Sequence, residues 1–160
     1  MPDAAFTETM QIGIVVGDLE AAMQRYVDDH GIGQWEIVEF HAGEAEALHE
    51  HGQPVERSWR LATTMVGTVQ WELIEPLDQE SDYARFLAEK GGGVHHIAVR
   101  PANYDRALAD MAEKGQEPVL NGVFGPGIRV AYLPTEYDLG VIVEIFSLDP
   151  APNQTTPDVK

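Results

Sequence analysis

The sequence contains no cysteine among its 160 residues. This absence excludes disulfide bonds and thiolate ligands, so any metal ion must be bound through histidine, aspartate, glutamate or amide oxygen. Lysine is scarce, occurring only as Lys90, Lys114 and Lys160, and arginine supplies the rest of the ten basic residues. Against 27 acidic residues, they leave a formal net charge of −17. This charge repels nucleic acids and anionic membranes, so we expect neither as a partner.

Long apolar runs are also missing. No run approaches the roughly 18 residues that are typical of a membrane span. The first ten residues, MPDAAFTETM, lack the basic segment and following apolar segment of a signal peptide. We therefore expect a cytoplasmic protein. The chain is 44% hydrophobic, which allows a sizeable core, and its length predicts a single domain over residues 1–160.

What the sequence does contain is an internal repeat. Residues 11–31 (QIGIVVGDLEAAMQRYVDDHG) and 96–115 (HIAVRPANYDRALADMAEKG) each combine a short apolar strand, a polar break, an amphipathic helix and a final glycine. Apolar residues recur at i, i+3, i+4 and i+7 in both helical segments. Asp18 and Asn103 are suited to cap the helix N-termini, and the final glycines are suited to end the helices.

Two later segments of the repeat also match. WRLA at residues 59–62 resembles IRVA at 128–131, and WELI at 71–74 resembles VEIF at 143–146. Each half therefore predicts a strand, a helix and about three further strands.

The repeat divides the chain into two βαβββ modules. We place the first module at about residues 9–77 and the second at about 94–148, joined by a helix at about 79–91. Residues 41–58 read as a long polar loop, with room for a helical turn. The tail at 149–160 has no periodicity, and we expect it to be frayed.

Two adjacent histidines begin the strand of the second module, within GGGVHHIAVR. Successive strand residues point to opposite faces, so only one of the two can face a given cavity. His95 shares a face with the bulky Ile97, and that face should pack against a helix. His96 lies on the other face and matches Gln11 in the first module. We therefore expect His96 to face a cavity as a metal ligand and His95 to be packed.

Glu72 and Glu144 are the second matched pair, in the largely apolar segments VQWELI and VIVEIF. A strand glutamate usually lies at an edge or faces solvent, but a buried one is costly unless it is paired or binds a cation. With Gln11 and His96, the two glutamates supply one imidazole, two carboxylates and one amide oxygen. This donor set predicts one divalent metal ion: Zn, Ni, Co, Mn or Fe.

The repeated βαβββ pattern and the stretches QIGIVVGDLEAA, GGGVHHIAV and VIVEIF resemble the vicinal oxygen chelate superfamily. This superfamily contains glyoxalase I, methylmalonyl-CoA epimerase, extradiol dioxygenases, and fosfomycin and bleomycin resistance proteins. The resemblance covers about residues 9–148. It implies an α+β fold in which two modules form a curved mixed sheet around a metal-centred cavity. It also implies the metal ligands: Gln11, Glu72, His96 and Glu144.

The stretch VQWELIEPLDQESDYARFLAEKGGGVHHIAV resembles the branch that contains epimerases and glyoxalases. Epimerases of this branch usually have the ligands His, Gln, His and Glu in that order. The order here is Gln, Glu, His and Glu, which resembles one form of glyoxalase I. Epimerases also use a glutamate on a mid-module strand as a second base, and Arg60 aligns with that position. This departure argues against two-base epimerisation.

The resemblance implies a metal-dependent isomerase or lyase, glyoxalase-like or epimerase-like, acting on a small molecule. Glu144 or Glu72 would remove a proton α to a carbonyl, and the metal would stabilise the resulting enediolate or enolate. Arg60 and Arg129, matched across the repeat, are candidates to bind a substrate carboxylate. The alternative is that both arginines are solvated and face outward. We also expect a homodimer, and the modules can pair within one chain or swap between two.

Two other functions stay open. Antibiotic-sequestering members of the superfamily use the same cavity without a metal, which makes a non-catalytic binding protein the main alternative. Dioxygenases of the superfamily typically bind their metal through two histidines and one glutamate. Here only His96 is a histidine at a ligand position, which ranks a dioxygenase lower.

Overall fold

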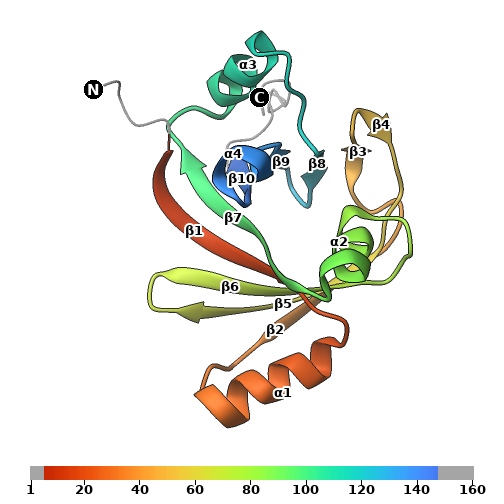
Figure 1. Ribbon diagram of the computed structural model, residues 1–160, viewed down its shortest axis with the longest axis vertical. Helices are drawn as coiled ribbons and strands as arrows, with labels where there is room; N and C mark the ends of the chain where they lie inside the picture. The colour runs from red at the N-terminus through yellow and green to blue at the C-terminus, as the bar shows by residue number, and fades with distance from the viewer. Residues whose placement is uncertain (1–5, 148–160) are drawn as a thin grey trace, which may run out of the picture.

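The two repeats form the two halves of one curled, mixed β-sheet (Figure 1). The computed structural model describes residues 6–147, so the expected tail at 149–160 lies outside the described residues. In chain order the elements are β1 (Phe6–Val15), α1 (Leu19–His30), β2 (Glu36–Phe40), β3 (Glu46–Glu50), β4 (Gln53–Pro54), β5 (Trp59–Val66), β6 (Val69–Pro76), α2 (Asp82–Lys90), β7 (Gly93–Pro101), α3 (Tyr104–Glu113), β8 (Leu120–Phe124), β9 (Ile128–Leu133), α4 (Glu136–Leu139) and β10 (Ile142–Ser147).

The strand order across the sheet is β2-β5-β6-β1-β7-β10-β9-β8-β3-β4. Strand β1 runs parallel to β6, β7 runs parallel to β10, and β1 and β7 pair antiparallel at the centre. The halves β1-α1-β2-β5-β6 and β7-α3-β8-β9-β10 are therefore the two predicted βαβββ modules, paired edge to edge within one chain. The expected α+β fold with a curved mixed sheet is confirmed.

The predicted helix ends are confirmed as well. The side chains of Asp18 and Asn103 each accept a hydrogen bond of 2.8 Å from the backbone N–H three residues on. These bonds satisfy donors that the first helical turn leaves free. Gly31 and Gly115, which follow α1 and α3, have φ angles of 67° and 71°. Glycine tolerates this left-handed conformation, which ends the helix.

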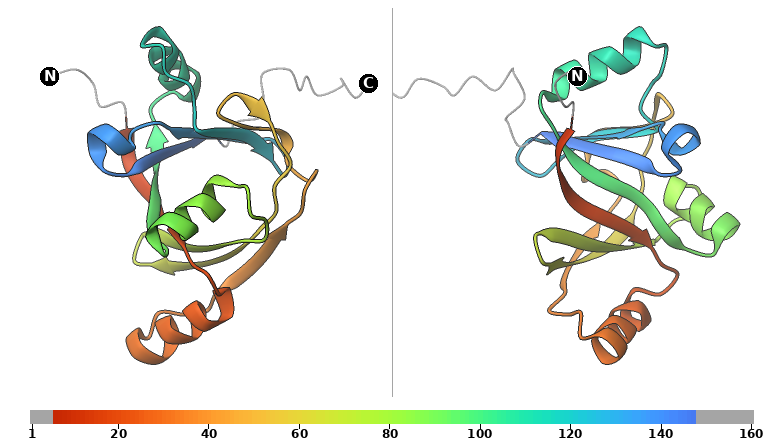
Figure 2. Two further views of the ribbon diagram at one scale, coloured as in Figure 1. Left: turned by 45° about the vertical axis from the view of Figure 1, so that its right-hand side comes forward. Right: turned by 60° about the vertical axis from the view of Figure 1, so that its left-hand side comes forward.

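Helices α1 and α3 cover the outer face of the sheet, whereas α2 contributes Tyr83 to the cavity on the inner face. Helix α1 packs on β5 and β6, and α3 packs on β10. Figure 2 shows these two helices at opposite ends of the molecule, with the sheet curling between them. Their buried contacts are apolar: Leu19, Ala22, Ala62 and Leu73 around α1, and Tyr104, Ala131, Leu133, Val143 and Ile145 around α3. Within residues 6–147, no helix is both long and apolar enough to cross a bilayer.

The structure corrects the polar loop expected at residues 41–58. This segment contains a short β-ribbon, β3 and β4, and β3 pairs antiparallel with β8 of the other module. Leu48 of β3 is only 6% exposed. Glu50 is buried as well and accepts a hydrogen bond of 3.1 Å from Nε of Arg57. The polar composition hid this strand because its carboxylate is buried with a paired arginine.

At the centre of the sheet, the backbone of β1 passes directly against the side chain of His96. Gly13 lies opposite His96 in the register between β1 and β7. A Cβ atom at residue 13 would overlap the imidazole ring. Gly13 therefore allows the ring to lie against β1.

We predict that Gly13→Ala displaces the imidazole of His96 and destabilises the protein. Because the ring or the strand must shift, the free energy of unfolding should fall by about 1–3 kcal/mol. Urea unfolding measures this loss, and the NMR signal of the His96 ring reports its displacement. Gly17→Ala is the matched control, since a Cβ there meets only Leu87 at 3.8 Å. Equal stability of the two variants would contradict the prediction.

Candidate active site

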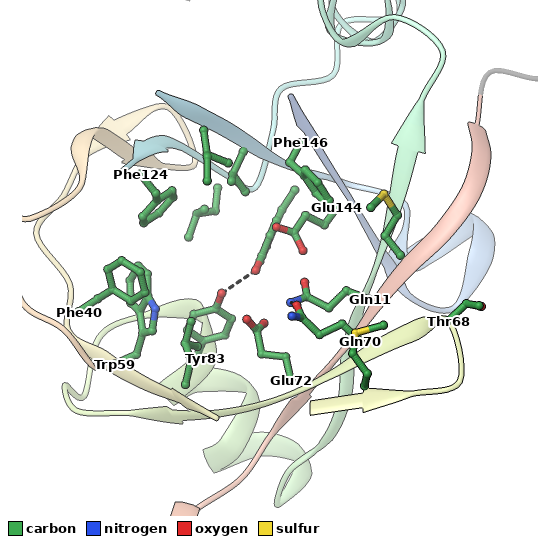
Figure 3. A pocket seen from close by; sticks show the side chains of 17 residues that line it. Gln11, Phe40, Trp59, Thr68, Gln70, Glu72, Tyr83, Phe124, Glu144 and Phe146 are labelled. Atoms are coloured by element: carbon green, nitrogen blue, oxygen red, sulfur yellow. Dashed lines mark hydrogen bonds between the residues drawn. The ribbon is translucent and has the colours of Figure 1, made fainter. Parts of the chain in front are cut away.

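The inner face of the sheet encloses a cavity of about 440 Å³ that both modules line. Figure 3 shows two different ends of it. One end is aromatic and carries Phe40, Trp59 and Phe124. The other end is polar and carries Gln11, Gln70, Glu72 and Glu144.

The polar end brings together three of the predicted ligands. Nε2 of His96 lies 3.1 Å from Oε2 of Glu144 and 3.6 Å from Oε2 of Glu72. The side chain of His96 is fully buried, and those of Glu72 and Glu144 are 10% and 9% exposed. His96 lies behind the two carboxylates, which themselves line the cavity.

The register of the sheet explains this convergence. Glu72 on β6 lies opposite Gly13 on β1, and Glu144 on β10 lies opposite Ala98 on β7. Residues directly opposite each other in a sheet share a face. Because Gly13 and Ala98 are small, each leaves room for the neighbouring carboxylate. The repeat thus places both glutamates equivalently in its two halves.

Gln11, the fourth predicted ligand, lines the same cavity but is engaged by another amide. Its Nε2 donates a hydrogen bond of 2.8 Å to Oε1 of Gln70, which lies opposite it in the β1–β6 register. Gln70 was not predicted from the sequence. Its signal was present, because a residue two positions before Glu72 shares its face of the strand.

Burial and the charges within the cluster together shift the pKa values of its side chains. Burial raises the pKa of Glu72 to about 7, and nearby Glu144 adds to this shift, while His96 and Gln11 partly oppose it. Burial alone would lower the pKa of His96, but the carboxylates of Glu144 and Glu72 outweigh it and raise that pKa above its ordinary value. A positive charge at this point therefore stabilises the ionised carboxylates.

The donor set fits a divalent metal ion. Nε2 of His96 and Oε2 of Glu144 are both buried, and neither has a hydrogen-bond partner in the described structure. Two ligand atoms that each lie about 2.1 Å from one ion are roughly 3.0–3.4 Å apart, close to the separation of these two atoms. Within residues 6–147, however, no three His, Asp or Glu side chains already stand in metal-binding geometry. The fit therefore rests on donor chemistry and on the distance between these two buried atoms.

His95 faces the packed side of β7, as strand alternation predicted. Its ring lies 5.1 Å from the ring of Tyr83 and 5.0 Å from that of Phe86, both on α2. Its Nδ1 also lies 3.2 Å from Nδ1 of His96. Burial, together with the charges of His96 and Lys90, lowers the pKa of His95 to about 3. His95 is thus a buried, neutral neighbour of the cluster.

A pair of tyrosines, which the sequence analysis missed, adds hydroxyl groups to the cavity. The hydroxyls of Tyr83 and Tyr132 lie 2.6 Å apart in a hydrogen bond, and both residues line the cavity. Burial raises the pKa of both well above its ordinary value, so both stay protonated. No sequence signal pointed to this pair, because Tyr83 belongs to the helix between the modules.

The structure places Arg60 and Arg129 outside the cavity, which corrects their assignment as substrate anchors. Arg60 donates two hydrogen bonds of 2.7 Å to the carboxylate of Glu20. Arg129 donates one of 2.6 Å to Asp105. The residues on either side of each arginine line the cavity, so strand alternation turns the arginines to the outer face.

Comparisons with known proteins agree with this architecture. The family model described as the glyoxalase/bleomycin resistance protein/dioxygenase superfamily matches residues 10–132. The mitochondrial methylmalonyl-CoA epimerase of Homo sapiens is 32% identical over 139 residues, covering 84% of this chain and 70% of that protein.

Solved structures of methylmalonyl-CoA epimerases are also similar to this chain. Methylmalonyl-CoA epimerase from Mycobacterium tuberculosis matches with a TM-score of 0.64 at 23% identity, over 95% of this chain and 93% of that one, which shows a common fold. A Streptomyces coelicolor methylmalonyl-CoA epimerase in complex with 2-nitronate-propionyl-CoA matches with a TM-score of 0.58 at 26% identity, over 88% and 96% of the two chains.

We predict that the raised pKa of Glu72 makes the metal-free protein less stable as pH rises. Unfolded glutamate has a pKa of 4.5, against about 7 for Glu72 in the folded protein. The folded state therefore binds more protons between these values. The contribution of the raised Glu72 pKa to the free energy of unfolding is fully present below pH 4.5 and is lost as pH rises through 7.

Urea unfolding of wild type and Glu72→Gln, with a chelator present, measures this effect between pH 5 and 8. As pH rises over this range, the free energy of unfolding of wild type should fall, relative to that of the variant, by up to about 3 kcal/mol. His95 has the opposite effect below pH 6.5, because its folded pKa is lowered, but it is present in both proteins. A stability difference that does not change with pH would refute the prediction.

Proposed function

Because this chain belongs to the glyoxalase/bleomycin resistance protein/dioxygenase superfamily, we propose that it is a metal-dependent isomerase or lyase. The proposed reaction removes a proton from the carbon next to a carbonyl group, as in an epimerase or a glyoxalase. One observation carries the proposal: Glu72, His96 and Glu144 converge from matched strands at the floor of a cavity of substrate size.

The residues that would hold the metal are Gln11, Glu72, His96 and Glu144. A divalent ion at this point would polarise a substrate carbonyl and stabilise the negative charge that proton removal leaves on its oxygen. His96 is fully buried and is not among the described lining residues of the cavity, so we assign it to the metal and not to the substrate.

Glu144 is the proposed general base. Its carboxylate lines the cavity, so it can accept a proton from a bound substrate. Glu72 lines the same cavity from the other module, so its carboxylate can also exchange a proton with a bound substrate. One carboxylate can thus remove a proton while the other returns one.

The named activity of the relatives favours an epimerase-like reaction. These relatives are methylmalonyl-CoA epimerases. In such enzymes a mid-module residue supplies the second base, whereas Arg60 faces outward in this protein. We therefore assign the second proton transfer to Glu72, which the repeat relates to Glu144.

A non-catalytic binding protein is the second candidate, and the aromatic lining of the cavity favours it. Such a protein would bind its ligand equally well with and without metal. Elemental analysis after dialysis and reloading separates the two candidates, because a sequestering protein would not retain stoichiometric metal.

We predict that His96→Ala abolishes stoichiometric metal binding, whereas His95→Ala retains it. His96 directs its unpartnered Nε2 at the carboxylates, while His95 packs against α2. Elemental analysis and calorimetric titration with Zn²⁺ measure the difference, and circular dichroism establishes that both variants fold. Equal loss of metal from two folded variants would show that the assignment of the ligand is wrong.

We predict that Glu144→Gln slows exchange of the substrate α proton by about 10²–10⁴-fold, because the amide cannot accept it. NMR in deuterated solvent follows the loss of the α-proton signal, using 2-methyl-branched acyl thioesters and thiohemiacetals of 2-oxo-aldehydes. Zinc content is measured in the same samples. Unchanged exchange in the folded, metal-loaded variant would move the role of base to Glu72.

A further inference from the structure

We propose that the cavity selects an uncharged, aromatic acyl group and rejects an acyl group that carries a free carboxylate. The inference rests on the proposed function, because it takes the occupant of the cavity to be the substrate. It specifies the chemistry of the substituent beside the exchanged proton.

The first support is the lack of cationic side chains in the cavity. No lysine or arginine lies among its described lining residues. Seven of the nine lysines and arginines in the described part of the chain form ion pairs with carboxylates: Arg57, Arg60, Arg85, Lys90, Arg100, Arg106 and Arg129. A substrate carboxylate would therefore find no arginine or lysine partner along the wall.

The second support is the charge of the centre itself. Glu72 and Glu144 contribute two negative charges when ionised, which a divalent ion would neutralise without leaving a positive excess. Without the ion, Nε2 of His96 lies 3.1 Å from Glu144 and 3.6 Å from Glu72, so any positive charge on that imidazole is already paired with carboxylates. In neither state does the floor of the cavity attract an additional carboxylate, and an unpaired buried carboxylate is costly.

The third support is the aromatic end of the cavity. The rings of Phe40, Trp59 and Phe124 lie within 5.6–6.0 Å of one another, in tilted and edge-on arrangements. They come from β2, β5 and β8 and face the end that carries the carboxylates (Figure 3). A substrate ring can extend this cluster with the same edge-to-face contacts.

The polar groups that line the cavity beside the two carboxylates are neutral. Gln11 and Gln70 offer amides, and Tyr83 and Tyr132 offer hydroxyls. Each hydroxyl carries one proton, and the bond between the two tyrosines uses only one of the two protons. The other is available to a carbonyl oxygen of the substrate. The cavity thus combines neutral donors with an aromatic wall.

Two N-acetylcysteamine thioesters test the inference, one of 2-phenylpropanoic acid and one of methylmalonic acid. Both carry a thioester, an α-methyl group and an α proton, and they differ only in phenyl against carboxylate. Calorimetric titration measures the affinity of each for the metal-free and the Zn²⁺-loaded protein. We expect the phenyl compound to bind at least about tenfold more tightly in both states.

Glu72→Gln distinguishes an effect of charge on ligand affinity from an effect of packing. It replaces a carboxylate by a neutral amide at nearly constant volume, so at about pH 8 the affinity for the methylmalonyl compound should rise while that for the phenyl compound changes little. Glu113→Gln on the exposed surface of α3 changes the net charge equally and should leave both affinities unchanged. Bound zinc is quantified for every protein.

The inference is overturned if the methylmalonyl compound binds wild type as tightly as the phenyl compound, or if the phenyl compound does not bind. The same samples are assayed for exchange of the α proton. Tight binding of the phenyl compound without exchange would sustain the inference and refute the proposed function. Exchange of the α proton in both thioesters, bound with similar affinity, would support the proposed function and overturn the inference.

Discussion

Glu72, His96 and Glu144 share one buried space at the centre of the sheet, and two of the three are acidic. Burying two carboxylates together is unfavourable unless a proton, an imidazolium or a metal ion compensates for their charge. The surroundings are adapted to this constraint. Gly13 and Ala98 make room for the side chains, amides and hydroxyls replace charged neighbours, and the arginines of the adjacent strands face outward. The acidic cluster therefore constrains which charges its surroundings can carry.

The internal repeat is what makes this arrangement possible in a single chain. Each module contributes a first strand and a parallel last strand, and the first strands β1 and β7 pair antiparallel. Matched side chains consequently approach the same point from opposed directions. In the proposed reaction, two glutamates so related would act on the two sides of one carbon atom.

Much of this site was predictable from the sequence because strand alternation and the repeat are local and regular. They identified Glu72, His96 and Glu144 as neighbours, and separated His96 from His95. They did not reveal that β3 pairs with β8, because that pairing joins distant segments of polar composition. Arg60 and Arg129 were matched correctly to each other, but alternation alone does not say which face of a strand lines the cavity. Tyr83 was not predicted as a cavity residue, because helical periodicity shows that a residue faces inward but not whether it lines a cavity or packs in the core.

The pairing of β3 with β8 also bears on the order in which the chain can fold during synthesis. The ribbon belongs by sequence to the first module, yet its hydrogen-bonding partner is made only after β7 and α3 have been synthesised. Until then, β3 presents an unpaired edge on the growing chain, and such edges promote aggregation. The first module is thus incomplete as an independent folding unit. Its final strand pairing waits on a contact of high sequence separation, which favours slow, concerted assembly of the two halves.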